Sequence, residues 1–296
     1  KDAASYPSFS TNTLILDNQN YTLSGGSILA SITKKPLYLN TGITVSDKTY
    51  DGGLSATVNT SNVTASGLVF GDVITGVAAT GSFQDKNAGN SKPVSITNLT
   101  LYGSDGNNYS PSVTQANISA SILKAPITVT ADSLTTTYTG ATQFILSDNY
   151  SVSGLVGGDT KSTLNGVSAT GQGINVGTYS TVASGSSANY NITFIPGTLT
   201  INKAALTVTA NSGSKVYGNS LSLNGTEFTT SGLQNGETAT NANLSISGNG
   251  NLPSANVGTY SITPSLLSGG TFNSNNYTIT YNPANLSVTA RPINLT

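Results

Sequence analysis

Two stretches of the 296-residue sequence repeat almost the same pattern: Ala125–Ala131 is APITVTA, and Ala204–Ala210 is AALTVTA. In both stretches apolar residues alternate with threonine, which is the period-two pattern of a strand with one buried face. Shorter relatives, KPLYL at residues 35–39 and RPINL at residues 291–295, lie on either side of them. The four stretches are separated by roughly 80 to 90 residues, a spacing that indicates tandem repeats.

Further landmarks recur in the same order after each first strand. They are a tyrosine turn, a Ser-Gly-Leu segment that leads to an acidic residue, an Asn-Val-Gly-Thr-Tyr segment, and an Asn-Tyr pair that opens a final strand. The residues of this repeat signature are Tyr50, Gly67, Asp72, Tyr109, Tyr138, Gly154, Asp159, Gly177, Tyr179, Tyr190, Tyr217, Gly232, Gly258, Tyr260 and Tyr277. Glu237 holds the acidic position of the last repeat, and Asn87-Ala88-Gly89 is a degenerate third landmark in the first. Such ordered recurrence is typical of a repeat architecture.

The landmarks divide the chain into repeats at residues 36–124, 125–203 and 204–290. Residues 1–35 match the C-terminal part of a preceding repeat, through the Asn20-Tyr21 pair, and residues 291–296 match the start of the next repeat. We therefore expect the natural protein to continue in both directions. Because the first residue is Lys1 rather than methionine, we also expect a processed or excised piece.

The composition favours an all-β fold, because Val, Ile, Thr and Tyr accompany many turn-forming Ser, Asn and Gly residues. Each repeat is long enough for several short strands in a sandwich or a β-grasp-like sheet with its own core. One short helical turn in each repeat, after Asp72, Asp159 and Glu237, is left open.

The joints between repeats are short. No Gly/Ser-rich or Pro-rich linker stands at Lys124 or Lys203, so the last strand of one repeat runs almost directly into the first strand of the next. Joints of this kind restrict bending, and they predict an extended rod on the order of 100 Å long.

Composition also argues against several classes of function. The net charge is −1 and the 11 basic residues are spread thinly, which leaves no phosphate-binding cluster for nucleic acid. No apolar run is long enough to cross a bilayer, so we expect no membrane insertion of this segment. The sequence contains neither histidine nor cysteine, which excludes the usual catalytic triads, thiolate metal sites and disulfides. We predict no enzyme activity, no cofactor and no metal.

Three local patterns have a plain structural interpretation beside a functional one. Gly158–Thr163 resembles a phosphate loop, but Thr160 stands where glycine must precede the lysine, so a solvated turn is favoured. Asp105 offers a single carboxylate to calcium, which takes six to eight oxygen ligands. The repeated tyrosines suit sugar binding, yet their recurrence in alternating strands favours a packing role.

The series of motifs resembles a known family. An LTVTA-type first strand, a Tyr-Gly turn, Ser-Gly-Leu leading to Gly-Asp, Asn-Val-Gly-Thr-Tyr and a final Asn-Tyr strand are similar to the MBG domain repeat. Residues 125–203 and 204–290 follow this pattern, whereas residues 36–124, with Tyr50-Asp51-Gly52, resemble the related YDG repeat. The resemblance implies a segment of a large secreted bacterial adhesin of the fibrillar or filamentous-haemagglutinin-like kind.

Three functions of different classes follow from these observations. The first is a passive stalk at the cell surface, which holds a binding region away from the cell and has the neighbouring repeats as its partners. The second is a self-associating filament or biofilm-matrix protein, in which other copies of the chain complete exposed strand edges. The third is a carbohydrate-binding module that uses solvent-facing tyrosines. The sequence identifies no host or matrix ligand.

Overall fold

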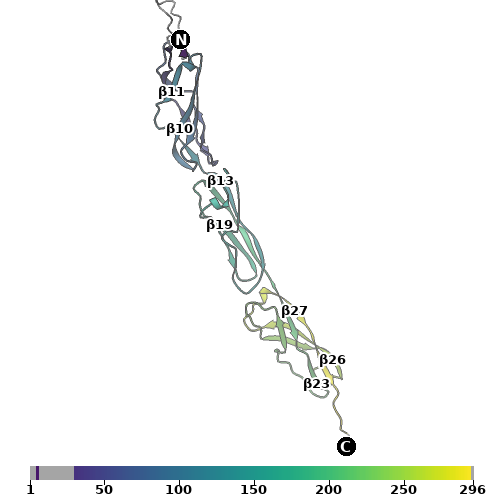
Figure 1. Ribbon diagram of the computed structural model, residues 1–296. Coiled ribbons are helices and arrows are strands. Elements are labelled where there is room, and N and C mark those ends of the chain that lie inside the picture. The colour runs from purple at the N-terminus through teal and green to yellow at the C-terminus, as the bar shows by residue number, and fades with distance from the viewer. Residues whose placement is uncertain (1–4, 7–29, 295–296) are drawn as a thin grey trace, which may run out of the picture. The chain divides into compact units, whose positions relative to one another are not determined.

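The computed structural model of the chain describes residues 5–6 and 30–294 (Figure 1). Strands and turns dominate this part of the chain, so the predicted all-β class is confirmed. The helical elements among the described residues are single 3-10 turns: η2 (Gly106–Asn108), η3 (Lys161–Thr163), η4 (Ser247–Asn249) and η5 (Ser274–Asn276). The predicted partial repeat at residues 1–35, with its Asn20-Tyr21 pair, lies mostly outside the described residues.

The chain divides into two compact units. Unit 1 contains the described residues up to Ile127 together with residues 154–165 and 186–192, and unit 2 contains residues 128–153, 166–185 and those from Thr193 onward. The joint at Lys124 belongs to unit 1, and the joint at Lys203 belongs to unit 2. Each unit therefore includes one place where consecutive repeats meet.

The first repeat is built from a five-stranded sheet, in the order β5-β12-β10-β9-β6, and a three-stranded sheet, in the order β11-β3-β8. Leu37 and Leu39 of β3 and Tyr109 of β11 pack with Val77 of β9 and Ile96 of β10, so the core lies between these sheets. The pairs β1-β2 and β4-β7 form separate two-stranded sheets. The strand bounds are β1 (Ser5–Tyr6), β2 (Ala30–Ser31), β3 (Lys35–Thr41), β4 (Thr44–Val45), β5 (Lys48–Thr49), β6 (Ser55–Ala56), β7 (Val58–Asn59), β8 (Thr64–Ser66), β9 (Gly76–Phe83), β10 (Gly89–Tyr102), β11 (Tyr109–Val113) and β12 (Ser119–Leu123).

The second repeat follows the same plan. A three-stranded sheet has the order β16-β13-β20, a four-stranded sheet has the order β14-β21-β19-β17, and β15 pairs with β18. The strand bounds are β13 (Ala125–Ala131), β14 (Leu134–Thr137), β15 (Gln143–Phe144), β16 (Tyr150–Ser153), β17 (Ser168–Thr170), β18 (Gln172–Gly173), β19 (Gly177–Ser184), β20 (Tyr190–Ile195) and β21 (Gly197–Asn202).

The third repeat has a three-stranded sheet in the order β24-β22-β27 and a four-stranded sheet in the order β23-β28-β26-β25. The strand bounds are β22 (Ala204–Ala210), β23 (Gly213–Val216), β24 (Phe228–Ser231), β25 (Asn241–Ile246), β26 (Gly258–Ser268), β27 (Tyr277–Asn282) and β28 (Ala284–Thr289). In β22, Leu206 and Val208 are buried and Thr207 and Thr209 are half-buried, which is the alternation that the repeated sequence predicts.

The core of unit 2 crosses the joint at Lys203. One cluster of buried residues includes Tyr138, Leu199 and Ile201 from the second repeat and Leu206 and Tyr277 from the third. The sequence predicted a separate core for each repeat. The continuous cluster arises because β21 ends at Asn202 and β22 begins at Ala204, so a single residue separates the two repeats.

The three helical turns left open by the sequence have different outcomes. After Asp159 the chain forms η3, but no helical turn directly follows Asp72 or Glu237, both of which lie in the described part of the chain. The N–H of Val73 donates to Asp105 Oδ2 at 2.8 Å, and the N–H of Thr238 donates to Thr271 Oγ1 at 2.9 Å. Side chains on other loops thus accept hydrogen bonds from backbone N–H groups that the start of a helix would leave without a partner.

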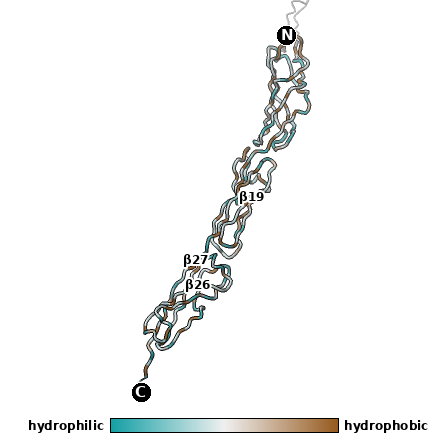
Figure 2. Tube along the Cα trace, turned by 180° about the vertical axis from the view of Figure 1, so that it is seen from behind, coloured by the Kyte–Doolittle hydropathy of each residue, from teal (hydrophilic) through white to brown (hydrophobic). Residues whose placement is uncertain are grey.

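Within the described residues, no helix is long and apolar enough to span a bilayer. Hydrophobic and hydrophilic residues follow one another closely along the trace (Figure 2).

Candidate functional site

Topology brings two repeated tyrosines to either side of the Lys203 joint. Tyr138 follows β14, whose parallel pairing with β21 sets Thr137 beside Asn202. Tyr277 opens β27, whose parallel pairing with β22 sets it beside Ala204. The tyrosine turn of the second repeat and the Asn-Tyr pair of the third therefore meet at the same place.

The two tyrosines share one carboxylate there. Tyr138 donates its hydroxyl hydrogen to Glu237 Oε1 at 2.5 Å, and Tyr277 donates to Glu237 Oε2. The rings pack edge to face with centroids 5.5 Å apart and planes at 82°. Tyr138 is 4% exposed and Tyr277 is 2% exposed. We call Tyr138, Glu237 and Tyr277 the Glu237 junction.

The same arrangement occurs in unit 1, at the Lys124 joint. Tyr50 donates to Asp159 Oδ2 at 2.9 Å, and Tyr190 donates to the same oxygen at 2.7 Å. The two rings again pack edge to face, with centroids 5.4 Å apart and planes at 82°. We call Tyr50, Asp159 and Tyr190 the Asp159 junction. The ring geometry repeats that of the Glu237 junction, although the acidic residue is one methylene shorter and both hydroxyls bond the same oxygen.

The loop that carries each carboxylate also holds the second tyrosine. The N–H of Val156 donates to the Tyr190 hydroxyl at 3.3 Å, and the N–H of Gln234 donates to the Tyr277 hydroxyl at 2.9 Å. Each of these hydroxyls thus accepts one hydrogen bond and donates another, which fixes its direction.

Glycine lets the tyrosine turn approach this loop closely. Gly140 has φ +74°, and a Cβ built on it would lie 2.5 Å from the Cβ of Asn235. Asn235 Nδ2 donates to the Gly140 carbonyl at 2.9 Å. In the Asp159 junction, a Cβ on Gly52 (φ +78°) would lie 2.6 Å from the Cα of Gly157. A side chain at either turn glycine would push the repeats apart.

An asparagine pair forms a second contact at each joint. In unit 2, Asn276 Oδ1 accepts from the N–H of Val176 at 3.0 Å, and its Nδ2 donates to Asn175 Oδ1 at 3.0 Å. In unit 1, Asn189 Oδ1 accepts from the N–H of Ala88 at 2.9 Å, and its Nδ2 donates to Asn87 Oδ1 at 3.2 Å. The third landmark of one repeat thus binds the Asn-Tyr pair of the next.

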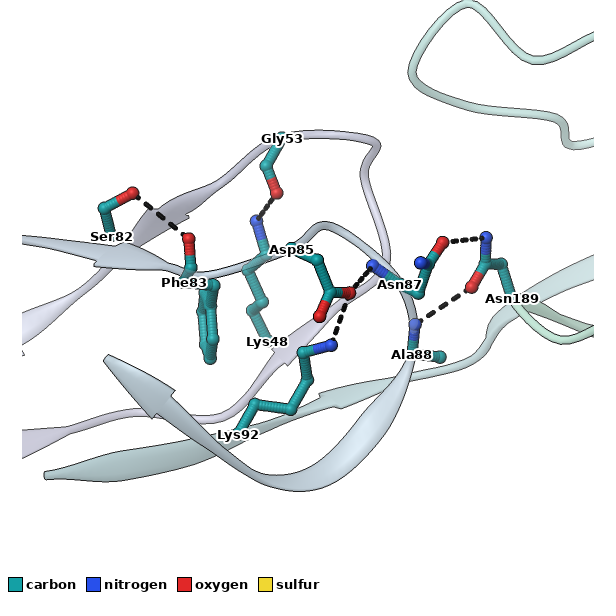
Figure 3. A network of polar contacts seen from close by, with 9 residues as sticks. All are labelled: Lys48, Gly53, Ser82, Phe83, Asp85, Asn87, Ala88, Lys92 and Asn189. Carbon is teal, nitrogen blue, oxygen red and sulfur yellow. Dashed lines mark hydrogen bonds and ion pairs between the residues drawn. The ribbon is translucent and has the colours of Figure 1, made fainter. Parts of the chain in front are cut away.

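An ion pair supports the asparagine contact in unit 1. Figure 3 shows Asn87 and Ala88 on a turn beside Asn189. Asp85 Oδ1 accepts from the N–H of Asn87 at 2.9 Å and from Lys92 Nζ at 2.6 Å. This turn keeps its place although Asn87-Ala88-Gly89 departs from the Asn-Val-Gly pattern.

Electrostatics favour neutral phenols at both junctions and an ionised carboxylate at the Asp159 junction. Burial, and then the hydrogen bond to Asp159, raises the pKa of Tyr190 to about 12. The same causes raise the pKa of Tyr50, and burial followed by the bond to Glu237 raises the pKa of Tyr138 and Tyr277. The hydrogen bonds from Tyr190 and Tyr50 hold the pKa of Asp159 below its usual range. Bonds from neutral donors to an ionised acceptor are stronger than neutral pairs.

The remaining signature residues are the equivalents of the junction residues in other repeats, or glycines of the loops that carry the carboxylates. Asp72 accepts from the Tyr109 hydroxyl at 2.5 Å, and Tyr217 is 44% exposed. The glycines of the Ser-Gly-Leu segments, Gly67, Gly154 and Gly232, have φ between +93° and +108°, and a Cβ there would meet the carbonyl oxygens of Pro36, Pro126 and Ala205.

The Asn-Val-Gly-Thr-Tyr segments form closed local turns. The Tyr179 hydroxyl donates to the Asn175 carbonyl at 2.8 Å, and the Tyr260 hydroxyl donates to the Asn256 carbonyl at 3.0 Å. Gly177 and Gly258 open β19 and β26 within the same turns. The two tyrosines are half-buried, and neither donates to a junction carboxylate.

The other candidate sites either take part in structural hydrogen bonds or lack the groups that binding would require. Asp105 Oδ2 accepts from Ser104 Oγ at 2.8 Å as well as from the N–H of Val73, so its carboxylate holds a turn. Lys161 begins η3. Within residues 5–6 and 30–294, no group of acidic, histidine or cysteine residues is placed to hold a metal ion. Burial of Tyr50, Tyr109, Tyr138, Tyr190 and Tyr277 keeps these rings from stacking on a sugar.

The sequence interpretation missed the junctions as sites. It treated the tyrosines as packing residues and did not pair them with carboxylates of the next repeat. It placed Asn189, Asn276 and Gly140 in the repeated landmarks but assigned them no contact between repeats. The available signal was the fixed order of the landmarks, since a motif that recurs in every repeat serves either the core or the contact between repeats.

Comparisons with known proteins agree with the family resemblance. A family model described as YDG domain matches residues 33–116, and one described as MBG domain (YGX type) matches residues 127–200 and 206–287. These matches confirm the predicted MBG repeats after a YDG-like repeat. No curated protein matches the chain.

Solved structures give only weak similarity. The crystal structure of Drosophila N-cadherin EC1-4 is 10% identical over 93% of this chain and 81% of that chain, with a TM-score of 0.26. That of Down Syndrome Cell Adhesion Molecule, N-terminal eight Ig domains, is 9% identical over 90% of this chain and 44% of that chain, with a TM-score of 0.21. These TM-scores are too low to support a conclusion about this chain.

Proposed function

The chain belongs to the family of MBG domains of the YGX type, and from that premise we propose that it is a non-enzymatic stalk segment of an extracellular bacterial adhesin. In this role its repeats hold a binding region away from the cell surface. YDG and MBG repeats are structural or binding domains rather than known enzyme families, which supports a mechanical role. Tandem YDG and MBG domains fit a repeat-containing protein of the extracellular adhesin type.

The observation that carries the proposal is the tyrosine–carboxylate junction, present at Lys124 and again at Lys203. A stalk transmits force and distance only if consecutive repeats do not swivel freely. Rotation at a junction would remove the hydrogen bond that crosses the joint, from Tyr50 to Asp159 or from Tyr138 to Glu237. Losing a hydrogen bond to a partly buried carboxylate costs more than losing an ordinary bond between neutral groups. The tyrosine turn is also linked by its backbone to the joint itself, since the N–H of Tyr138 donates to the Asn202 carbonyl at 2.8 Å.

Small-angle scattering of the full chain in solution tests the stalk proposal. An extended rod predicts a maximum dimension on the order of 100 Å. A compact globule of this length would have a radius of gyration of roughly 19 Å and a much smaller maximum dimension. A compact particle at low concentration would contradict the proposal.

A second arm links the scattering result to the junctions. Glu237→Gln keeps the size of the side chain but removes its charge, so we expect a broader distribution of particle dimensions. Glu227→Gln is the matched control, because Glu227 accepts from backbone N–H groups of residues 224–226 within its own loop of the third repeat. If consecutive repeats rotate freely about their joints, the two variants will give the same scattering.

A further inference from the structure

Four asparagines of the chain stand directly before a glycine: Asn165, Asn224, Asn235 and Asn249. At such a pair the backbone nitrogen of the glycine can attack the side-chain amide carbon of the asparagine, because the glycine has no side chain to block the approach. The new C–N bond closes a succinimide ring, and the amide nitrogen leaves as ammonia with the proton of the glycine nitrogen. Water then opens the ring at either carbonyl and gives aspartate or isoaspartate. Asparagine is for this reason a thermolabile residue.

Two of the four glycine nitrogens are held by hydrogen bonds. The N–H of Gly225 donates to Glu227 Oε2 at 3.0 Å, and the N–H of Gly250 donates to the Ser247 carbonyl at 3.0 Å. A nitrogen whose hydrogen is bound to an acceptor gives up that proton less readily, and it cannot turn toward the asparagine without breaking the bond. The asparagines before these two glycines are therefore protected.

The glycine nitrogens of the other two pairs are accessible. Within residues 5–6 and 30–294, no backbone carbonyl accepts from the N–H of Gly236 or of Gly166. Asn235 and Asn165 are exposed to water, as are the glycines that follow them. A Cβ built on Gly236 would have no atom within 4 Å, so nothing covers this pair. The structure thus selects two of the four asparagines as reactive.

Asn235 also forms a contact between repeats, at the Glu237 junction. Its Nδ2 donates to the Gly140 carbonyl at 2.9 Å, and its Cβ lies against the same glycine turn. A carboxylate has no hydrogen to donate. Aspartate at this position would therefore place a negatively charged oxygen beside the carbonyl oxygen of Gly140, where the asparagine places a donor. The loss of the amide would turn an attraction between the repeats into a repulsion.

The folded joint restrains the reaction. The N–H of Glu237 donates to the Gln234 carbonyl at 2.9 Å, with φ +48° at Asn235 and +73° at Gly236, which are the features of a type I′ turn. Ring closure brings the glycine nitrogen against the side-chain amide carbon, a rotation for which the turn and the bond to Gly140 must open. Deamidation here therefore proceeds from a locally opened joint, and its rate follows the population of that state.

We propose that Asn235 is a deamidation site, at which a slow and irreversible reaction with water releases the Lys203 joint. An opened joint reacts, and the product opposes closing, so modified chains accumulate as the joint opens. The equivalent position at the Lys124 joint is Gly157, which has no side-chain amide to lose. The modification goes beyond the stalk function, and it needs only the folded joint in order to occur.

Peptide mass mapping of the full chain during incubation at pH 8 and 37 °C tests the proposal. The mass gain of deamidation should appear at Asn165 and at Asn235, and should be slower at Asn224 and Asn249. Ion-exchange separation of the intact chain follows the added negative charge over the same time. The chain contains all four pairs, so each sample carries its own internal comparison.

Opening the joint should accelerate the reaction at Asn235 alone. Gly140→Ala places a Cβ against Asn235, so the rate there should rise roughly fivefold while the rate at Asn165 stays constant. Gly218→Ala is the matched control, because it also puts alanine at a positive φ but meets Arg291 instead. It should leave both rates unchanged.

An Asn235 that stays intact while Asn165 reacts would overturn the proposal, as would equal rates at Asn235 in the two glycine variants. Asn235→Asp imitates the product without incubation and should lower the midpoint of denaturant unfolding, whereas Asn165→Asp should not. Equal midpoints for these two variants would overturn the claim that the product releases the joint. Scattering of the unreacted chain reports on the stalk alone, so the two proposals fail separately.

Discussion

The same tyrosine has different surroundings according to its place in the series of repeats. Tyr50 and Tyr138 are buried and donate to a carboxylate about 100 residues further along, whereas the equivalent Tyr217 is exposed. The sequence alone predicts the same packing role for all three tyrosines. Their energetic contributions should differ, because a hydroxyl that bonds a charged group in a buried site contributes more than one that bonds water.

Tyr138→Phe should lower the free energy of unfolding by about 1–2 kcal/mol, because it removes one donor from Glu237 and leaves the ring in place. Denaturant unfolding followed by tyrosine fluorescence measures the change. Tyr217→Phe is the matched control and should change stability by less than about 0.5 kcal/mol. Equal effects of the two substitutions would contradict a special role for the buried hydroxyl.

The Asp159 junction should be lost in alkali. An unfolded tyrosine has a pKa of about 10, and folding raises that of Tyr190 to about 12. The folded state therefore holds this proton more tightly, so its stabilising contribution is complete below pH 10 and disappears as the pH rises towards 12. Thermal unfolding between pH 8 and 12 should give a falling midpoint, with a smaller fall for Tyr190→Phe. A midpoint with the same pH dependence in both proteins would exclude this group as the cause.

At the scale of elements, parallel pairing of an early strand with a late strand of the same repeat decides where the junction residues lie. The β22–β27 pair sets Tyr277 at the start of its repeat, and the β14–β21 pair sets Tyr138 at the end of the previous one. The turn glycines then decide how closely the repeats approach.

Gly140→Ala should destabilise the chain more than Gly218→Ala. Both glycines have a positive φ, so alanine is strained at each by about 1 kcal/mol. Only at Gly140 would the new Cβ also lie 2.5 Å from Asn235, whereas at Gly218 the nearest atom is the flexible guanidinium of Arg291 at 3.3 Å. The difference between the two midpoints of denaturant unfolding isolates the cost of the inter-repeat contact. Equal midpoints would mean that the glycine turn makes no close contact with the next repeat.

Sequence periodicity predicted the strands better than it predicted their partners. The alternation in β22 and the Asn-Tyr start of β27 are local features, and local propensity was sufficient for them. The helical turn left open after Glu237 did not form, because the N–H of Thr238 donates to Thr271 on another loop and its carbonyl accepts from that loop. The bond from Tyr138 to Glu237 joins residues in different repeats, and no pattern within a single repeat specifies such a contact.

At the scale of the whole molecule, the repeats are linked rather than merely adjacent. The joint at Lys203 has a continuous apolar cluster, a shared carboxylate and an asparagine pair on its two sides. A chain of independent domains would need none of these. Neighbouring repeats should therefore stabilise one another, as nearest-neighbour contacts do in other repeat proteins.

A double-mutant cycle on Tyr138 and Glu237 tests this coupling most directly, because the two residues belong to different repeats. Free energies of unfolding are measured for Tyr138→Phe, Glu237→Gln, the double variant and the unchanged chain. We predict a coupling energy of about 1–3 kcal/mol for this pair, and none for the control cycle of Tyr217 and Glu237. Additivity within about 0.3 kcal/mol in both cycles would contradict the claim that the tyrosine–carboxylate junction ties consecutive repeats together.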